Sequence, residues 1–309
     1  MRTYFINTLK VLAEQDKRIM LLSGDLGFSV LEKFQEQFPS RFLNMGVAEA
    51  NMIGVAAGLA LWNMKPYVYS IVPFATMRCF EQIRNDICYQ NVDVKIIGIG
   101  GGLAYGVLGP THHSREDIAI MRALPNMTVV CPGDPVETEL IAKESLNING
   151  PMYIRLGKGN DPIVHKDKPK LKVGKGIVVK EGKDITIIAT GNILNNALIS
   201  AYQLSEKGLR TRVISMHTVK PLDKGIVLRA AKETKAIFTI EEHSKIGGLG
   251  SAVSEVLSEN NSNIIFRNIG LPDAFEKIVG SQEYLRKINN LSPEAITDFI
   301  YNTHQKYKN

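Results

Sequence analysis

Short apolar runs alternate with segments of helical character along most of the 309-residue chain, and this alternation limits the possible folds more than any other feature. Arg18–Gly24 and Val94–Gly100 are predicted to be strands, whereas Val47–Leu61 between them is predicted to be a helix. Strands that are apolar throughout are typical of a parallel sheet covered by helices on both faces. We therefore expect an α/β fold with mostly parallel sheets.

The alternation stops at Gly157–Gly176, where Lys, Gly, Pro and Asp residues replace the apolar periodicity. A second series begins with the strand-like run Asp184–Thr190. The interruption indicates a linker between two domains, in agreement with a usual size of about 150 residues per domain. We expect a first domain at 1–165, a linker at 166–178 and a second domain at 179–309.

Composition excludes several classes of protein. Hydrophobic residues make up 44% and charged residues 22%, as in ordinary globular proteins. The net charge is +6, but the Lys and Arg residues are scattered and form no basic stripe with aromatics, so we expect no nucleic-acid partner. No run approaches the roughly 18 apolar residues of a membrane span. Three widely separated cysteines and the absence of a signal-like start predict a cytoplasmic protein without disulfides.

The first segment that could carry chemistry is Asn44–Ala60, in which Glu49 stands at the start of an Ala- and Gly-rich helix. Gly54 and Gly58 share one helical face, and each lowers helix stability by roughly 1 kcal/mol relative to Ala. A helix that contains them is expected to need close backbone approach on that face. Glu49 is either a functional carboxylate or an acidic residue favoured by the helix dipole.

The second segment, Gly98–Ser114, is rich in glycine and follows a predicted strand, where a parallel sheet places its ligands. It matches neither the dinucleotide fingerprint nor the P-loop. It ends in His112 and His113, whose side chains point apart in an extended backbone, and no other His or Cys spacing suggests zinc. We predict no metal site, and the histidines are either functional or ordinary loop residues.

Two further segments have alternative interpretations. Phe74, Met77 and Phe80 recur at helical spacing, which is more typical of a core than of a ligand platform. Ile240–Ser251 combines a strand, an acidic turn with Glu242 and a glycine-rich helix start. That helix start could bind an anion, pack against the rest of the chain or contact a subunit. We assign no chemistry to it, nor to the neighbouring His243 and Gly247.

Taken together, the motifs resemble the C-terminal half of transketolase. The matching stretches are GVAEANMIGVAAGLA, PFATMRCFEQIRND, GPTHHSREDIAIMRALPNMTVVCPGDPVE, GPMYIRLGKG, MHTVKPLD and EEHSKIGGLGS. The resemblance implies a pyrimidine-binding domain followed by a transketolase C-terminal domain. In this family many bacteria and archaea encode the two halves as separate chains.

The resemblance implies a thiamin diphosphate site with defined roles. Glu49 matches the glutamate that activates the cofactor through a pyrimidine ring nitrogen. Phe74 matches the aromatic that stacks on the pyrimidine, with Phe80 as the competing candidate. Asp25 matches an aspartate near the cofactor. A buried carboxylate that faces a weak ring base suits this chemistry because the two groups share a proton.

For the substrate, His112 matches the family histidine near the reacting carbon, which makes it catalytic as well as substrate-binding. Arg155 matches the arginine that binds the sugar phosphate. The chain departs from the family at Leu108, where many transketolases have an aspartate that reads a donor hydroxyl, and near Gly100, where they have a histidine. Leucine accepts no hydrogen bond. The departures predict a non-standard donor or acceptor.

The resemblance also implies a partner. The family's Gly-Asp-Gly motif for diphosphate and magnesium has no match, since the run Gly24–Leu26 lacks the third glycine. We expect an N-terminal transketolase subunit to hold the diphosphate and the magnesium. A two-plus-two heterotetramer with two-fold symmetry is the assembly that follows.

Other functions stay open at this point. One alternative is the beta subunit of a 2-oxo acid dehydrogenase first component, and another is a 1-deoxyxylulose-5-phosphate synthase-like enzyme. Both share the glutamate and the domain order. The runs GPTH and MHTVKPLD favour a split transketolase. A non-catalytic assembly subunit is a further alternative, which the presence of Glu49 disfavours.

Overall fold

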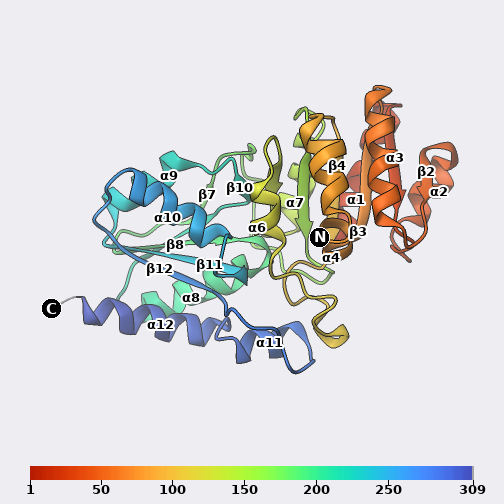
Figure 1. Cartoon of the computed structure of the whole chain (residues 1–309). Coiled ribbons are helices and arrows are strands. Elements are labelled where there is room, and N and C mark those ends of the chain that lie inside the picture. Colours follow the sequence, from red (N-terminus) through yellow and green to blue (C-terminus); the bar gives the residue numbers. More distant parts are fainter. Residues whose placement is uncertain (308–309) are drawn as a thin grey trace.

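The computed structural model describes residues 1–307, which form two α/β units side by side (Figure 1). The first unit contains a seven-stranded sheet in the order β10-β5-β6-β4-β3-β1-β2, in which only β10 is antiparallel to its neighbour. Its strands are β1 (Ile19–Ser23), β2 (Phe42–Asn44), β3 (Lys65–Ile71), β4 (Lys95–Ile99), β5 (Thr128–Val130), β6 (Met152–Leu156) and β10 (Thr218–Lys220).

Helices cover both faces of this sheet because successive strand residues point to opposite sides. Leu22 packs in a core with α3, η2 and α6, whereas Leu21 packs in a second core with α1 and α7. The helical elements are α1 (Arg2–Gln15), α2 (Glu32–Gln37), η1 (Pro39–Arg41), α3 (Glu49–Leu61), α4 (Val72–Thr76), α5 (Phe80–Gln82), η2 (Ile83–Tyr89), η3 (Gly106–Leu108), α6 (Asp117–Ala123) and α7 (Pro135–Glu144).

The second unit contains a five-stranded sheet in the order β12-β11-β8-β9-β7, with β7 antiparallel at one edge. Its strands are β7 (Ile177–Lys180), β8 (Ile185–Thr190), β9 (Thr211–Ser215), β11 (Ala236–Ser244) and β12 (Ile265–Leu271). Its helices are η4 (Gly191–Ile193), α8 (Leu194–Glu206), α9 (Lys224–Glu233), α10 (Leu249–Glu259), α11 (Gln282–Ile288) and α12 (Pro293–Lys306). One core lies between this sheet and helices α8 and α12, and another lies between the sheet and helices α9 and α10. The predicted α/β fold with mostly parallel sheets is confirmed.

The second half of the chain adds one strand to the sheet of the first unit. Strand β10 comes from the second half of the sequence, yet it pairs with β5 of the first unit, with Thr218 opposite Val130. The backbone of the adjoining residue His217 also accepts the N–H of Cys131 over 2.7 Å. The second half therefore contributes directly to the sheet of the first.

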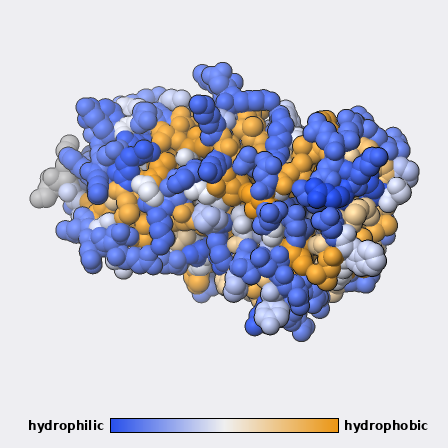
Figure 2. Space-filling model, turned by 90° about the horizontal axis from the view of Figure 1, so that it is seen from above, coloured by the Kyte–Doolittle hydropathy of each residue, from blue (hydrophilic) through white to orange (hydrophobic). Residues whose placement is uncertain are grey.

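The surface carries apolar patches among hydrophilic side chains, as Figure 2 shows for the face seen from above. On the first unit, Phe28, Val47, Leu61 and Trp62 are exposed, with Trp62 at 85%. None of the helices within residues 1–307 combines the length and apolar character that crossing a bilayer requires.

The glycines of α3 lie on its outer face. Apart from the adjoining residues and backbone of α3 itself, a Cβ added at Gly54 or Gly58 would meet no heavy atom of the described chain within 4 Å. The close approach expected from these glycines is therefore not made within residues 1–307.

Candidate active site

The candidate site begins at Glu49, the first residue of α3, which lies at the carboxyl edge of the first sheet. Its carboxylate is fully buried, and Oε1 accepts a hydrogen bond of 2.8 Å from Ser70 Oγ in β3. Gly24, directly after β1, lies so close that an added Cβ would be 3.1 Å from both Glu49 Oε1 and Ser70 Oγ. Two strand ends and a helix start thus enclose one oxygen of the carboxylate.

The other carboxylate oxygen faces Arg78. Arg78 Nη1 donates to Glu49 Oε2 over 2.6 Å, and the arginine side chain is 41% exposed. The Arg78 guanidinium carbon lies 4.3 Å from the centre of the Phe74 ring, in cation–π geometry. Arg78 therefore joins the buried carboxylate to an aromatic ring near the surface.

Phe74 also contacts His112. The two ring centres are 5.2 Å apart at an interplanar angle of 72°, an edge-to-face arrangement. Thr111 Oγ1 lies 3.0 Å from His112 Nδ1, and the Tyr105 ring lies 6.2 Å away on another side. The structure therefore brings together three predicted site residues, Glu49, Phe74 and His112, in a continuous line of contacts.

The two candidate aromatics differ in their surroundings. Phe80 is partly buried and packs against the core formed beneath α3 and α6. Phe74 instead contacts Arg78 and His112. The position of Phe74 beside the Glu49–Arg78 pair favours it over Phe80 as the ring that faces a ligand.

Asp25 directly follows Gly24, whose backbone lies against Glu49. It is exposed, has a left-handed backbone with φ of 57°, and accepts a 2.9 Å hydrogen bond from Asn44 Nδ2. It lines a hollow of about 280 Å³ together with Ser23 and Phe28. Neither Glu49 nor Phe74 lines this hollow.

Arg155, which the resemblance assigns to the sugar phosphate, lies in a buried ion pair with Asp117. The residue is only 4% exposed, and its Nε donates to Asp117 Oδ2 over 2.8 Å. Its Nη2 donates to the backbone carbonyls of Ser114 and Glu242 over 2.9 and 3.1 Å. The guanidinium thus forms an ion pair within the first unit and a hydrogen bond to the second unit, and its contact with a sugar phosphate stays a prediction.

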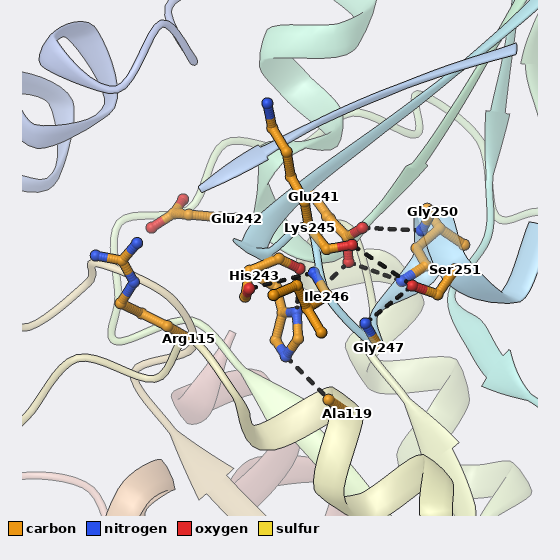
Figure 3. A network of polar contacts seen from close by, with 12 residues as sticks. Arg115, Ala119, Glu241, Glu242, His243, Lys245, Ile246, Gly247, Gly250 and Ser251 are labelled. Carbon is orange, nitrogen blue, oxygen red and sulfur yellow. Dashed lines mark hydrogen bonds and ion pairs between the residues drawn. The ribbon is translucent and has the colours of Figure 1, made fainter. Parts of the chain in front are cut away.

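The predicted acidic turn with Glu242 is the end of strand β11. The carboxylate of the preceding residue, Glu241, occupies the start of α10, the position considered above for an anion (Figure 3). Glu241 accepts the backbone N–H groups of Leu249 and Gly250 over 2.7 and 2.8 Å. Burial raises the pKa of Glu241 to about 7. His243 Nε2 accepts the N–H of Ala119 over 3.3 Å, which connects β11 to α6. The segment thus packs against the first unit.

Comparison with known protein families shows to which family the chain belongs. The family model described as "Transketolase, pyrimidine binding domain" matches residues 1–162, more than half of the chain. The chain belongs to the transketolase family. The model described as "Transketolase, C-terminal domain" matches residues 174–296. The two matches follow one another in the order that the sequence predicts.

Two relatives within the transketolase family are described as transketolase subunits. The chain is 40% identical over 274 residues to an apulose-4-phosphate transketolase subunit of Phocaeicola vulgatus, with 88% of this chain and 87% of the relative covered. It is 38% identical over 297 residues to a 6-deoxy-6-sulfo-D-fructose transketolase subunit of Clostridium sp. strain MSTE9, with 96% and 92% covered. A solved structure described as "Split gene transketolase, inactive beta4 tetramer" is 39% identical, with a TM-score of 0.88 and 97% and 96% covered. The predicted resemblance to the C-terminal half of a split transketolase is confirmed.

Sequence reasoning missed Arg78 in this transketolase-family chain. Its position shortly after Phe74, in a segment already singled out, was the available signal. Within residues 1–307, no three His, Cys, Asp or Glu side chains are grouped so that they could hold a metal ion.

Proposed function

We propose that this chain is the C-terminal subunit of a split transketolase-like enzyme, which transfers a two-carbon ketol unit between sugar substrates with thiamin diphosphate. The observation that carries the proposal is the buried Glu49 carboxylate, which faces Arg78 and Phe74 at the carboxyl edge of a parallel sheet. His112 contacts the Phe74 ring edge-to-face, and we place the meeting point of substrate and cofactor beside it. The family relationship supports the same cofactor.

The residues present fit the pyrimidine part of this cofactor. Thiamin diphosphate supplies a carbon nucleophile and an electron sink when it is bound. Phe74 offers a ring face for a flat heteroaromatic group, and Glu49 offers a carboxylate that shares a proton with a ring nitrogen. Ser70 fixes one oxygen of Glu49, so that the other is aimed outward, where Arg78 now lies. Arg78 is sufficiently exposed to give way to a ligand.

We place the substrate beside His112 and expect a non-standard sugar. Leu108, 49% exposed, and Val107, 62% exposed, form an apolar rim on the loop that ends in His112. This rim cannot accept a hydrogen bond from a sugar hydroxyl. Two relatives carry names with unusual sugars, apulose 4-phosphate and 6-deoxy-6-sulfo-D-fructose. Since Arg155 is buried, we assign the anionic group of the substrate to other residues or to the partner chain.

The proposed division of labour assigns the pyrimidine to the first domain, 1–165, which a linker at 166–178 joins to the domain at 179–309. A partner N-terminal subunit holds the diphosphate and magnesium, and two copies of each chain form the enzyme. The outer face of α3, with Gly54, Gly58 and the exposed Trp62, is a surface that another chain can approach closely. The related split-gene transketolase is inactive as a beta4 tetramer, which supports the need for a partner. Cytoplasmic localisation stays a prediction from the sequence.

The test is reconstitution. The chain is co-expressed with a candidate N-terminal subunit that carries the Gly-Asp-Gly motif, and the complex is given thiamin diphosphate, magnesium and a panel of isotope-labelled ketoses with aldose acceptors. Transfer of two labelled carbons supports the proposal. Decarboxylation of a 2-oxo acid alone, or condensation of pyruvate with an aldehyde, would instead establish one of the alternative enzymes. Unchanged turnover of the complex after Glu49→Gln would identify a non-catalytic subunit.

A further inference from the structure

One buried carboxylate of the second unit contacts the backbone of the glycine-rich segment Gly98–Ser114. Glu242 lies in β11 and is 1% exposed, and its Oε1 accepts the backbone N–H of Leu103 over 2.6 Å. Figure 3 shows that Glu241 and Glu242 point to opposite sides of β11. Glu241 thus caps α10, whereas Glu242 reaches across the boundary between the units.

The backbone of the glycine-rich segment is shaped to receive this carboxylate. Gly102, directly before Leu103, has a left-handed φ of 70°. A Cβ at Gly102 would lie 2.6 Å from Glu242 Oε1. Backbone conformation and close approach therefore both require glycine at this position.

The carboxylate of Glu242 is also fixed from its other side. Gln282 Nε2 lies 2.9 Å from Oε1, and Arg286 Nε lies 2.5 Å from Oε2, both from α11. Arg286 Nη2 also donates to Asn192 Oδ1 over 3.1 Å. A buried charge with this many donors is stably oriented, so Glu242 acts as a fixed anchor.

The anchor lies at the base of the loop that carries His112. Gly102 and Ser114 close this base: Ser114 N donates to Gly102 O over 2.9 Å, and Gly102 N donates to Ser114 Oγ over 2.6 Å. His112 lies two residues before Ser114, which closes the base. A shift of the base therefore moves His112 with it.

The rest of the loop lies on the second unit as well. The Leu103 side chain is fully buried in the core of that unit, in a cluster that includes Leu285. At the tip of the loop, a Cβ at Gly106 would be 2.3 Å from Gly280 O. The loop is thus supported from β11, α11 and the segment before α11, although Glu49 and Phe74 belong to the first unit.

We infer that Glu242 is a positioning residue of the active site, which sets the place of His112 relative to Glu49 and Phe74. The inference rests on the proposed function, and it gives the C-terminal domain a role in the reaction. Without the carboxylate, the Leu103 N–H and Arg286 lose their buried acceptor, and the base of the loop loosens. A misplacement of about 1 Å in a catalytic group lowers turnover by about 100-fold.

The experiment compares Glu242→Ala, Glu242→Gln and Glu255→Gln in the complex of this chain with its partner subunit. Glu255→Gln is the control at an exposed contact between the units, because Arg122 Nη2 of α6 lies 2.7 Å from Glu255 Oε2 of α10. Hydrogen exchange of the peptides covering 102–114 and of those covering α3 is measured, together with kcat and the Kd of thiamin diphosphate.

For Glu242→Ala, we expect exchange at 102–114 to become about tenfold faster, with α3 unchanged. We expect kcat to fall by about 100-fold while the cofactor Kd stays within about twofold, because the pyrimidine site lies in the first unit. Glu242→Gln keeps an acceptor for Leu103 N–H and is expected to recover part of the loss. Glu255→Gln should match the parent protein.

The inference is overturned if 102–114 exchanges at the parental rate in Glu242→Ala, or if exchange rises equally across the second sheet, which would indicate a purely structural role. If Glu242→Ala does not fold, the same two criteria are applied to Glu242→Gln. A parental complex without two-carbon transfer would contradict the proposed function instead, and the localised change in exchange would still decide whether Glu242 anchors the loop.

Discussion

Arg78 Nη1 donates to the outward oxygen of the Glu49 carboxylate over 2.6 Å, at the position where a ligand would meet that oxygen. The inner oxygen is held by Ser70, so the carboxylate cannot easily turn away from the site. The Arg78 guanidinium also lies against Phe74. A single exposed arginine therefore covers both groups that we assign to the pyrimidine.

Glu49→Gln is expected to lower kcat of the reconstituted complex by at least about 100-fold, because an amide cannot share a proton with the ring nitrogen as a carboxylate does. The side chain keeps its size and can still accept from Ser70, so the thermal unfolding temperature should change little. Steady-state kinetics and a thermal melt check both points. Glu81→Gln, an exposed acid of the neighbouring segment, is the control and should leave kcat unchanged. Equal activity of the Glu49 and Glu81 variants would contradict the role of Glu49.

Arg78→Gln is expected to strengthen cofactor binding by about threefold, since the partly exposed ion pair that must break contributes modestly. Calorimetric titration of the complex with thiamin diphosphate and magnesium measures this. Arg84→Gln serves as the control, because Arg84 is bonded to Asn85 Oδ1 rather than to Glu49. Weaker binding by Arg78→Gln would show that Arg78 holds the cofactor and does not merely cover its site.

The sequence predicted the sheets well because buried parallel strands leave a continuous apolar signal: Arg18–Gly24 contains β1 (Ile19–Ser23), and Val94–Gly100 contains β4 (Lys95–Ile99). Strand β10 left no such signal, because a three-residue segment shows no periodicity. Its pairing with β5 depends on contacts between distant parts of the chain.

The same limit applies to the site. Glu49 stood out because a family motif surrounds it, and its burial agrees with the expected chemistry. Arg155 also matched a motif, but its partner Asp117 lies 38 residues earlier, and no local pattern shows that the pair is buried. Arg78 was missed because its contacts to Glu49 and Phe74 form only in the folded chain and leave no pattern in the sequence.

His243 is expected to make the stability of the chain depend on pH. Its Nδ1 lies 2.8 Å from Ser244 O, and its Nε2 accepts from Ala119, so the neutral ring satisfies both contacts. Burial lowers the pKa of His243 from 6.5 to about 4. Because unfolding then takes up a proton, the stability from this residue is complete above about pH 6.5 and is lost as the pH falls toward 4.

Denaturant unfolding at pH 7.5 and pH 5 measures this effect. Between pH 7.5 and pH 5, the free energy of unfolding of the parent protein should fall by about 2 kcal/mol more than that of His243→Gln. Glu241, whose pKa burial raises to about 7, acts in the opposite sense, because its contribution is lost as the pH rises through 7. Glu241 Oε2 lies 3.7 Å from His243 Nδ1, so the difference between the two proteins reports the titration of His243 together with its coupling to Glu241. Identical pH dependence of the two proteins would contradict the assignment.

The variant Arg155→Met tests whether Arg155 stabilises the fold or binds a phosphate group of the substrate. The substitution leaves Asp117 buried without its cationic partner, so we expect the free energy of unfolding to fall by about 3–5 kcal/mol. Arg210→Met is the control, because Arg210 is 59% exposed in its pair with Asp184 and its loss should change stability little. Denaturant unfolding of both variants, followed by KM for sugar substrates in the complex, gives the answer. Unchanged stability with a strongly raised KM would support Arg155 as a phosphate ligand, whereas the buried contacts to Asp117, Ser114 and Glu242 predict the reverse.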